Sequence, residues 1–196
     1  LDLTFSMPKS ASILALVSGD RRILDAHLAA VRSTMAQLVE KQFAEARNYE
    51  RSRNGEPERT GNLVYALFAH DTSRALDPQG HIHAVVANLT RDLKGNWKAL
   101  WNGEIWKNNT TIGQFYHAAF RAQLQELGYE ILATQGTQVV PARTGITSRA
   151  ERKQSSTGDG ESVVDLINSG KIDIVINTPS GRSARADGYE IRAATV

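Results

Sequence analysis

The chain has 196 residues, of which 41% are hydrophobic and 22% charged, and its formal net charge is +2. These values are ordinary for one globular domain and favour no particular class of partner. Because the sequence contains no cysteine, disulfides and thiolate metal sites are excluded, and any metal must be held by His, Asp or Glu. We find neither an apolar run of membrane-spanning length nor a signal segment, so we expect no membrane insertion and a cytoplasmic location.

The N-terminal segment predicts a strand followed by two helices. Residues 1–6 alternate apolar and polar side chains, as in a half-buried strand, with Asp2 on the polar face. Pro8 suits the first turn of a short helix that ends before Gly19. Apolar residues at steps of three and four then predict a longer helix over residues 20–45 with Asp20 as its N-cap.

The middle of the chain predicts a sheet. Residues 47–59 are charged and centred on Asn54-Gly55, which indicates an exposed cationic hairpin. The apolar runs 62–70 and 81–90 predict two neighbouring strands, each covered on both faces, with turn-forming residues between them. Shorter strands are expected at residues 97–101, 129–133 and 138–140, and a helix over residues 110–127 that Gly128 ends. The fold class is therefore α+β, an antiparallel sheet with helices packed on one side.

The character of the sequence changes near residue 142. Residues 144–160 are rich in Ser, Thr, Gly and charge, which is typical of a linker. A short helix at 163–167, a strand at 172–176 and a last helix at 187–194 make a small β-α fragment that cannot bury a core alone. We accordingly predict a domain over 1–141, a linker over 142–160 and a C-terminal fragment over 161–196.

Three histidines form the strongest chemical signal. His81 and His83 stand two apart on a predicted strand and therefore share one face, and His70 ends the strand before. If these strands pair antiparallel, three imidazoles converge and leave open positions on a bound metal, as catalysis requires. The alternative is three histidines on a buried sheet without a metal, but the spacing favours a metal site. His27 and His117 lie at the edges of helical apolar stripes and are expected to be structural.

The stretches LDLTFSMPKS, TGNLVYALFAHDTSR, HIHAVVANLT and WKAL together resemble the MobF class of conjugative relaxases, which are HUH endonucleases. The likeness covers about residues 1–140 and implies a palm of antiparallel strands that nicks single-stranded DNA at a plasmid transfer origin by transesterification. It implies that a divalent metal (Mn, Mg, Zn or Ni) is bound by His70, His81 and His83. Asp2 matches the family's catalytic acidic residue, which orients a metal-binding histidine or helps to activate the nucleophile. The implied partners are that DNA and other conjugation proteins, in a bacterial cytoplasm.

The same resemblance implies a tyrosine near the N-terminus that attacks the phosphate and stays linked to the 5′ end of the cut strand. This sequence starts directly in the first strand, and we match none of its tyrosines to that nucleophile. We therefore expect a truncated domain with impaired nicking, in which slow metal–water hydrolysis is the most that remains. The tyrosines present are Tyr49, Tyr65, Tyr116, Tyr129 and Tyr189.

Arg74, next to the metal-binding strand, is the best single candidate for a DNA contact. Other basic side chains and three tryptophans are weaker candidates for backbone contacts and base stacking, namely Lys9, Arg47, Arg51, Arg53, Arg59, Trp97, Trp101 and Trp106.

Two other functions stay open. One is a non-catalytic, metal-stabilised module that binds single-stranded DNA. The other follows from residues 159–196, which resemble the C-terminal end of the carbamoyl-phosphate synthase large chain, in its regulatory domain. That likeness implies a loop at Asn177 and Thr178 that helps to hold an effector's phosphate, and a chain made of two joined pieces.

Overall fold

The computed structural model describes residues 1–50, 53–134, 148–151, 162–172 and 174–175. The elements in chain order are β1 (Asp2–Ser6), α1 (Lys9–Leu16), α2 (Arg22–Thr34), the π-helix η1 (Met35–Phe43), β2 (Glu45–Asn48), β3 (Glu56–Arg59), β4 (Tyr65–Thr72), β5 (Pro78–Val86), β6 (Thr90–Arg91), β7 (Trp97–Lys98), β8 (Leu100–Trp101), α3 (Gly103–Lys107), α4 (Asn109–Glu126), β9 (Leu132–Thr134), β10 (Arg149–Glu151) and α6 (Val163–Asn168).

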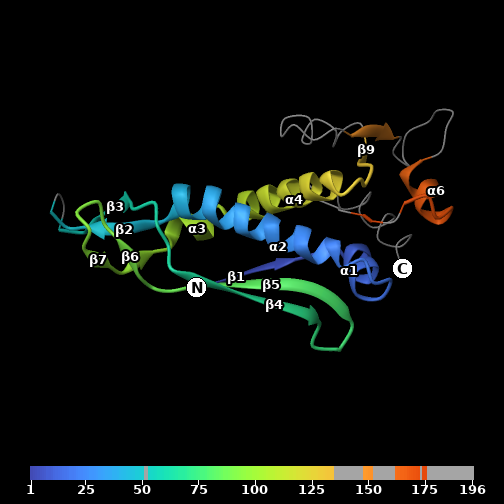
Figure 1. The fold of residues 1–196 in the computed structure, drawn as a ribbon. Helices are drawn as coiled ribbons and strands as arrows, with labels where there is room; N and C mark the ends of the chain where they lie inside the picture. Colours follow the sequence, from blue (N-terminus) through green and yellow to red (C-terminus); the bar gives the residue numbers. More distant parts are fainter. Residues whose placement is uncertain (51–52, 135–147, 152–161, 173, 176–196) are drawn as a thin grey trace.

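The main sheet is antiparallel and has the order β1-β5-β4, so β5 is its central strand (Figure 1). The backbone register pairs His81 with both Ser6 and His70, and pairs His83 with Thr4 and Phe68. The prediction that β4 and β5 are each covered on both faces is wrong. Strand β4 is an edge strand, and Phe68 is 51% exposed because one face of the sheet has no helix over it. Val85 of β5 is also exposed on this histidine face.

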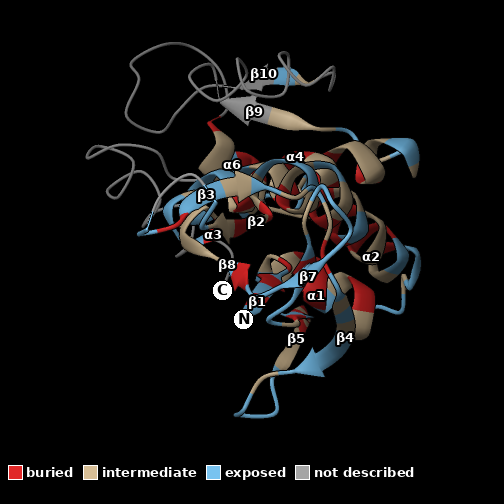
Figure 2. Ribbon diagram, turned by 90° about the vertical axis from the view of Figure 1, so that its left-hand side faces the viewer, coloured by how far each residue is buried: buried red, intermediate tan, exposed pale blue. Residues whose placement is uncertain are grey.

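The other face of this sheet is buried beneath the helices. Alternate side chains of β1 and β5, among them Phe5 and Ile82, point into the core, while their neighbours stay exposed or half-buried. Helix α2 packs along α4 above the sheet (Figures 1 and 2). The ring of Tyr116 of α4 packs against the ring of Phe5 in a tilted arrangement, with the ring centroids 5.3 Å apart. This arrangement confirms the α+β class with helices on one side of an antiparallel sheet.

The long predicted helix is two segments. Helix α2 continues into the π-helix η1, which ends at Phe43, close to the expected end. Asp20 lies one residue before the structural N-cap, and its carboxylate accepts a hydrogen bond from the backbone N–H of Arg22. Helix α3 was not expected from the sequence, because its five residues are too few to show a helical period.

A second, smaller sheet lies at the end of the molecule opposite the β4–β5 turn (Figure 1). Strands β2 and β3 form the predicted hairpin around Asn54-Gly55, and β8 pairs with β2 on its other side. The strand expected over residues 97–101 is split in two, because β7 pairs with β6 whereas β8 joins β2.

The C-terminal part combines confirmed and revised elements. Helix α6 forms where a short helix is predicted, and a capping box between Ser162 and Asp165 closes its N-terminus. Strand β10 falls within the predicted linker and pairs parallel with β9. The described residues of 172–176 form no strand, although Val175 hydrogen-bonds to the Ser10 side chain through its backbone N–H, at 2.8 Å. The strand expected at 138–140, the helix expected at 187–194, Asn177, Thr178 and Tyr189 lie outside the described residues.

Among the helices of the described residues, we find none that combines the length and the apolarity needed to cross a bilayer.

Candidate metal centre

The three predicted histidines come together on the open face of the main sheet. Their ring centroids are 5.2 Å apart for His70 and His81, 5.3 Å for His70 and His83, and 5.2 Å for His81 and His83. The alternation of β5 puts His81 and His83 on one face, and antiparallel pairing puts His70 directly opposite His81.

Asp2 lies against one of these rings. Its Oδ2 is 2.8 Å from Nδ1 of His83, and the hydroxyl of Thr4 is 3.3 Å from the same nitrogen. A carboxylate only accepts hydrogen bonds, so Nδ1 of His83 is the donor in this contact and Nε2 is the nitrogen left to face a metal. The sequence indicated Asp2 by resemblance. Thr4 was missed, although the alternation of residues 1–6 puts it on the same face as Asp2.

His81 is oriented in the same way by the backbone. Its Nδ1 lies 3.0 Å from the carbonyl oxygen of Gln79, which only accepts, so Nε2 is again the nitrogen left to face a metal. Gln79 and Gly80 together oppose the single residue Asp71 on β4, so the sheet has a β-bulge beside the histidines. Nothing in the residue types around Gln79 could have shown this contact in advance.

The donor set fits a divalent metal. In a site with metal–nitrogen distances of about 2.1 Å, tetrahedral geometry puts imidazole centres roughly 5 Å apart, close to the separations of these rings. As the rings stand, the described residues contain no group of three or more His, Asp or Glu side chains already placed as ligands. The distances between the rings therefore suit a bound metal ion, but their orientations do not. Binding requires the rings to rotate so that their Nε2 atoms point to one place.

The candidate DNA contacts are divided between the two ends of the molecule. Arg74 is exposed on the turn between β4 and β5, four residues after His70. Trp97 and Trp101 lie instead at the second sheet, where the Arg91 guanidinium is 5.4 Å from the first ring and the Arg47 guanidinium 3.8 Å from the second. Among the described candidates, Arg74 lies on the turn that joins the two histidine strands, whereas Arg51 lies outside the described residues. Lys9 of α1 donates to the carbonyl oxygen of Pro78, at 3.0 Å.

The other two histidines are packed into the helical layer, as predicted. His27 is buried, its Nδ1 is 2.9 Å from the Tyr116 hydroxyl, and burial lowers its pKa to about 4, with a smaller contribution from the charge of His81. Burial likewise lowers the pKa of His117 to about 4. Burial also raises the pKa of Tyr116 well above its usual range, so this phenol stays protonated.

The described tyrosines lie away from the histidine cluster or have their hydroxyls occupied. Tyr116 bonds to His27, and the Tyr129 hydroxyl donates to Asp20 at 2.8 Å. Tyr49 is exposed in the β2–β3 hairpin, at the opposite end of the molecule from the β4–β5 turn (Figure 1). Tyr65 opens β4, and its ring packs against the core.

The sequence profile of the TrwC relaxases matches residues 1–157. The chain belongs to the TrwC relaxase family. The multifunctional conjugation protein TraI of Escherichia coli is 37% identical over 175 residues, which cover 83% of this chain and 10% of TraI. The chain therefore spans about a tenth of the curated relative's length. A metal-bound structure of the conjugative relaxase TrwC with OriT DNA superposes with a TM-score of 0.63 and 31% identity, over 99% of this chain and 70% of that protein.

The relaxase family is not the chain's only likeness. The large chain of carbamoyl phosphate synthase from Clavibacter michiganensis is 60% identical over 77 residues, which cover 38% of this chain and 7% of that protein. This match is longer than the stretch 159–196 that carries the likeness in the sequence. The share of this chain matched by TraI and the share matched by the synthase together add up to more than the whole chain, so some residues are matched by both.

Proposed function

We propose that this chain is the metal-binding part of a conjugative relaxase, which acts on single-stranded DNA at a transfer origin and cuts it by transesterification. The observation that carries the proposal is the cluster of His70, His81 and His83 on an uncovered sheet face, with Asp2 against one ring. TraI is a conjugation protein and TrwC has been solved with OriT DNA and with a metal, which supports the same function here.

The three histidines would hold a divalent metal through their Nε2 atoms. When bound, such a metal polarises a phosphate oxygen and stabilises the negative charge that develops there. Manganese, magnesium, zinc and nickel are the candidate ions, and three imidazole ligands favour the other three over magnesium, which prefers oxygen.

The protein's own groups position the site. Asp2 keeps the proton of His83 on Nδ1 and thereby fixes which nitrogen faces a metal. The carbonyl of Gln79 does the same for His81. Arg74, for which the described part of the chain shows no hydrogen bond or ion pair, is free to contact a phosphate of the DNA backbone.

We expect this 196-residue chain alone to form no covalent link to DNA. The described tyrosines are either bonded within the helical layer, packed in the core or remote from the histidines. Incubation with a fluorescent single-stranded oligonucleotide, followed by denaturing electrophoresis, should show no labelled protein band, because only a covalent adduct survives denaturation. An adduct would show that one of these tyrosines, or Tyr189, serves as the nucleophile.

The metal part of the proposal is tested by thermal unfolding with Mn²⁺ or Zn²⁺. The parent chain should gain stability on adding the ion, because a ligand that binds only the folded state raises the unfolding temperature. His81→Ala should lose that gain. The control His117→Ala removes a histidine outside the cluster and should keep it. No gain in the parent chain would refute the metal site.

A non-catalytic module for single-stranded DNA is the second candidate, favoured by the distance of the described tyrosines from the histidines. It predicts that the chain with its metal binds a single-stranded oligonucleotide but releases no cut product, even after long incubation. A regulatory fragment of carbamoyl-phosphate synthesis, the third candidate, is supported only by the match to the synthase. It predicts tight binding of a phosphorylated effector that survives loss of all three histidines.

A further inference from the structure

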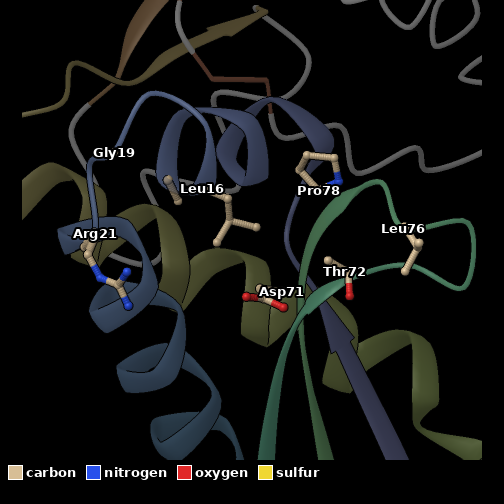
Figure 3. Close-up of a pocket in the computed structure, with 8 residues that line it drawn as sticks. Leu16, Gly19, Arg21, Asp71, Thr72, Leu76 and Pro78 are labelled. Carbon is tan, nitrogen blue, oxygen red and sulfur yellow. The ribbon is translucent and has the colours of Figure 1, made fainter.

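A cleft of about 360 Å³ opens where the connection between α1 and α2 meets the β4–β5 turn (Figure 3). Its size suits one nucleobase with its sugar. Its walls are mixed, with apolar side chains beside polar ones, and two charged side chains from different elements face it. The lining consists of Ala15, Leu16, Gly19, Arg21, Asp71, Thr72, Leu76 and Pro78.

The two charged groups are unused within the fold. In the part of the chain that the structure describes, neither the guanidinium of Arg21 nor the carboxylate of Asp71 has a hydrogen bond or an ion pair. Figure 3 shows both side chains reaching into the same space from opposite sides, with Leu16 between them. The cleft therefore offers a donor and an acceptor to a ligand that has both kinds of group.

Leu76 supplies a second, independent indication of a ligand. Its φ is 64°, and among the described residues it is the only one other than glycine in the left-handed region. Its side chain is 80% exposed, so packing within the protein does not offset the free energy of this unfavourable backbone conformation. Hydrogen bonds around Ser73 hold the turn in place, from the backbone N–H of Leu76 to the Ser73 carbonyl at 2.9 Å and from the Ser73 N–H to the Asp77 carbonyl at 2.9 Å. The turn thus presents an apolar side chain at the mouth of the cleft.

We propose that this cleft binds an unpaired guanine base of the single-stranded DNA, next to the phosphate held at the histidines. The inference rests on the proposed function, which supplies the single-stranded DNA. Guanine carries two neighbouring N–H donors, N1–H and N2–H, that one carboxylate can accept together, and its O6 and N7 accept from a guanidinium. Adenine, cytosine and thymine each offer the carboxylate fewer N–H groups, so Asp71 selects guanine. Leu16 and Leu76 flank the base on its apolar faces.

The position of the cleft allows one strand of DNA to reach both sites. Asp71 directly follows His70 on β4, and β4 is the edge strand of the sheet. Successive side chains of a strand point to opposite faces, so the cleft and the histidines lie on the two sides of this edge. A strand of DNA that passes round the edge therefore places neighbouring nucleotides at the two sites.

The test titrates the full 196-residue protein with dGMP, dAMP, dCMP and TMP in EDTA and follows the methyl resonances of Leu16 and Leu76 by NMR. We expect dGMP to shift these resonances and to bind about tenfold more tightly than dAMP, the difference that one charge-assisted hydrogen bond makes. Asp71→Asn should reduce the affinity for dGMP to that for dAMP. Glu56→Gln, which removes an exposed carboxylate on β3 at the far end of the molecule, should leave the preference unchanged.

Leu76→Gly separates the ligand role from a structural one. Glycine relieves the left-handed backbone, so this variant should unfold at a higher temperature than the parent while it binds all four nucleotides more weakly. Equal affinity for the four nucleotides, no shift at Leu16 and Leu76 with dGMP, or a guanine preference retained in Asp71→Asn would each overturn the proposal. Because EDTA removes metal from the titration, its result is independent of whether the histidines bind an ion.

Discussion

At the scale of single residues, the pair formed by Asp2 and His83 does the most to define the candidate metal centre. The carboxylate is 2.8 Å from Nδ1, on a side chain that is half exposed, so the contact orients the ring more than it stabilises the fold. The contact holds one tautomer of a half-buried imidazole, which otherwise divides its proton between two nitrogens.

Replacing Asp2 by Asn should therefore weaken metal binding without unfolding the protein. Loss of a carboxylate behind a ligating histidine typically lowers metal affinity about 10- to 100-fold. Competitive titration of Mn²⁺ or Zn²⁺ with a chelating dye measures the change. Asp25→Asn makes the same change of charge on the exposed side of α2 and should have no effect. Equal affinities for the two variants would rule out an orienting role for Asp2.

His27 makes the stability of the fold depend on pH. Burial lowers its pKa to about 4 in the folded protein, against about 6.5 in an unfolded chain, so the unfolded state takes up the proton first. The contribution of His27 is fully present above pH 6.5 and is lost as the pH falls toward 4, by about 3 kcal/mol in all.

The variant His27→Phe keeps an aromatic ring against Tyr116 and removes the titration. Urea unfolding at a series of pH values should show a shallower loss of stability between pH 6.5 and 4 for the variant than for the parent. His117, whose pKa is also lowered to about 4, remains in both proteins and accounts for part of the shared slope. Parallel curves would mean that His27 is not protonated differently in the two states.

At the scale of elements, the β2–β3 hairpin depends on a glycine at its turn. Gly55 has φ +68°, and a Cβ at this position would lie 2.8 Å from a ring carbon of Tyr49. Gly55→Ala should lower the free energy of unfolding by about 1–2 kcal/mol because of the left-handed backbone alone, and by more if Tyr49 cannot move. Gly113→Ala is the matched substitution, because helix α4 has open space at Gly113. Alanine there should raise the free energy of unfolding by about 0.5–1 kcal/mol. Chemical denaturation measures both, and changes of the same sign would contradict this account.

The sequence predicted the two histidine strands and their pairing, but not which of them is central. The alternation in β1 and the spacing of His81 and His83 report side-chain direction, which is a local property of a strand. The apolar runs in β4 and β5 suggested burial on both faces, yet Phe68 of β4 and Val85 of β5 are exposed on the histidine face. Apolar content cannot distinguish a side chain covered by its own chain from one that meets a partner.

The cleft could not be predicted for a related reason. Arg21 and Asp71 are 50 residues apart, and each is an unremarkable surface charge in the sequence. Only the meeting of the α1–α2 connection with the β4–β5 turn puts them in one space. The left-handed backbone of Leu76 is equally invisible, because leucine is not a residue that indicates such a conformation.

At the scale of the whole molecule, the C-terminal fragment is tied to the relaxase-like part. The Ser10 hydroxyl donates to the carbonyl of Val175 at 3.4 Å and accepts from its backbone N–H at 2.8 Å, and Ile174 packs against the main core. The predicted division into two domains and a linker stays a prediction, but these contacts show that the described part of the fragment does not stand alone.

Ser10→Ala tests how much this connection stabilises the fold. The substitution leaves the backbone N–H of Val175 without its partner and should lower the free energy of unfolding by about 1–2 kcal/mol. Ser33→Ala, a serine on helix α2 distant from the fragment, should leave stability unchanged or raise it slightly. Equal stability of the parent and Ser10→Ala would show that the Ser10–Val175 hydrogen bonds contribute nothing to the stability of the fold.

The central position of β5 has a consequence for how the molecule opens. A strand hydrogen-bonded on both sides is the last part of a sheet to exchange its amide protons with solvent, whereas edge strands fray. His81 and His83 are on that strand, and His70 is on an edge. Local unfolding of β4 would therefore release one of the three proposed metal ligands while the other two keep their spacing, so a metal held there would load and unload stepwise within a folded core.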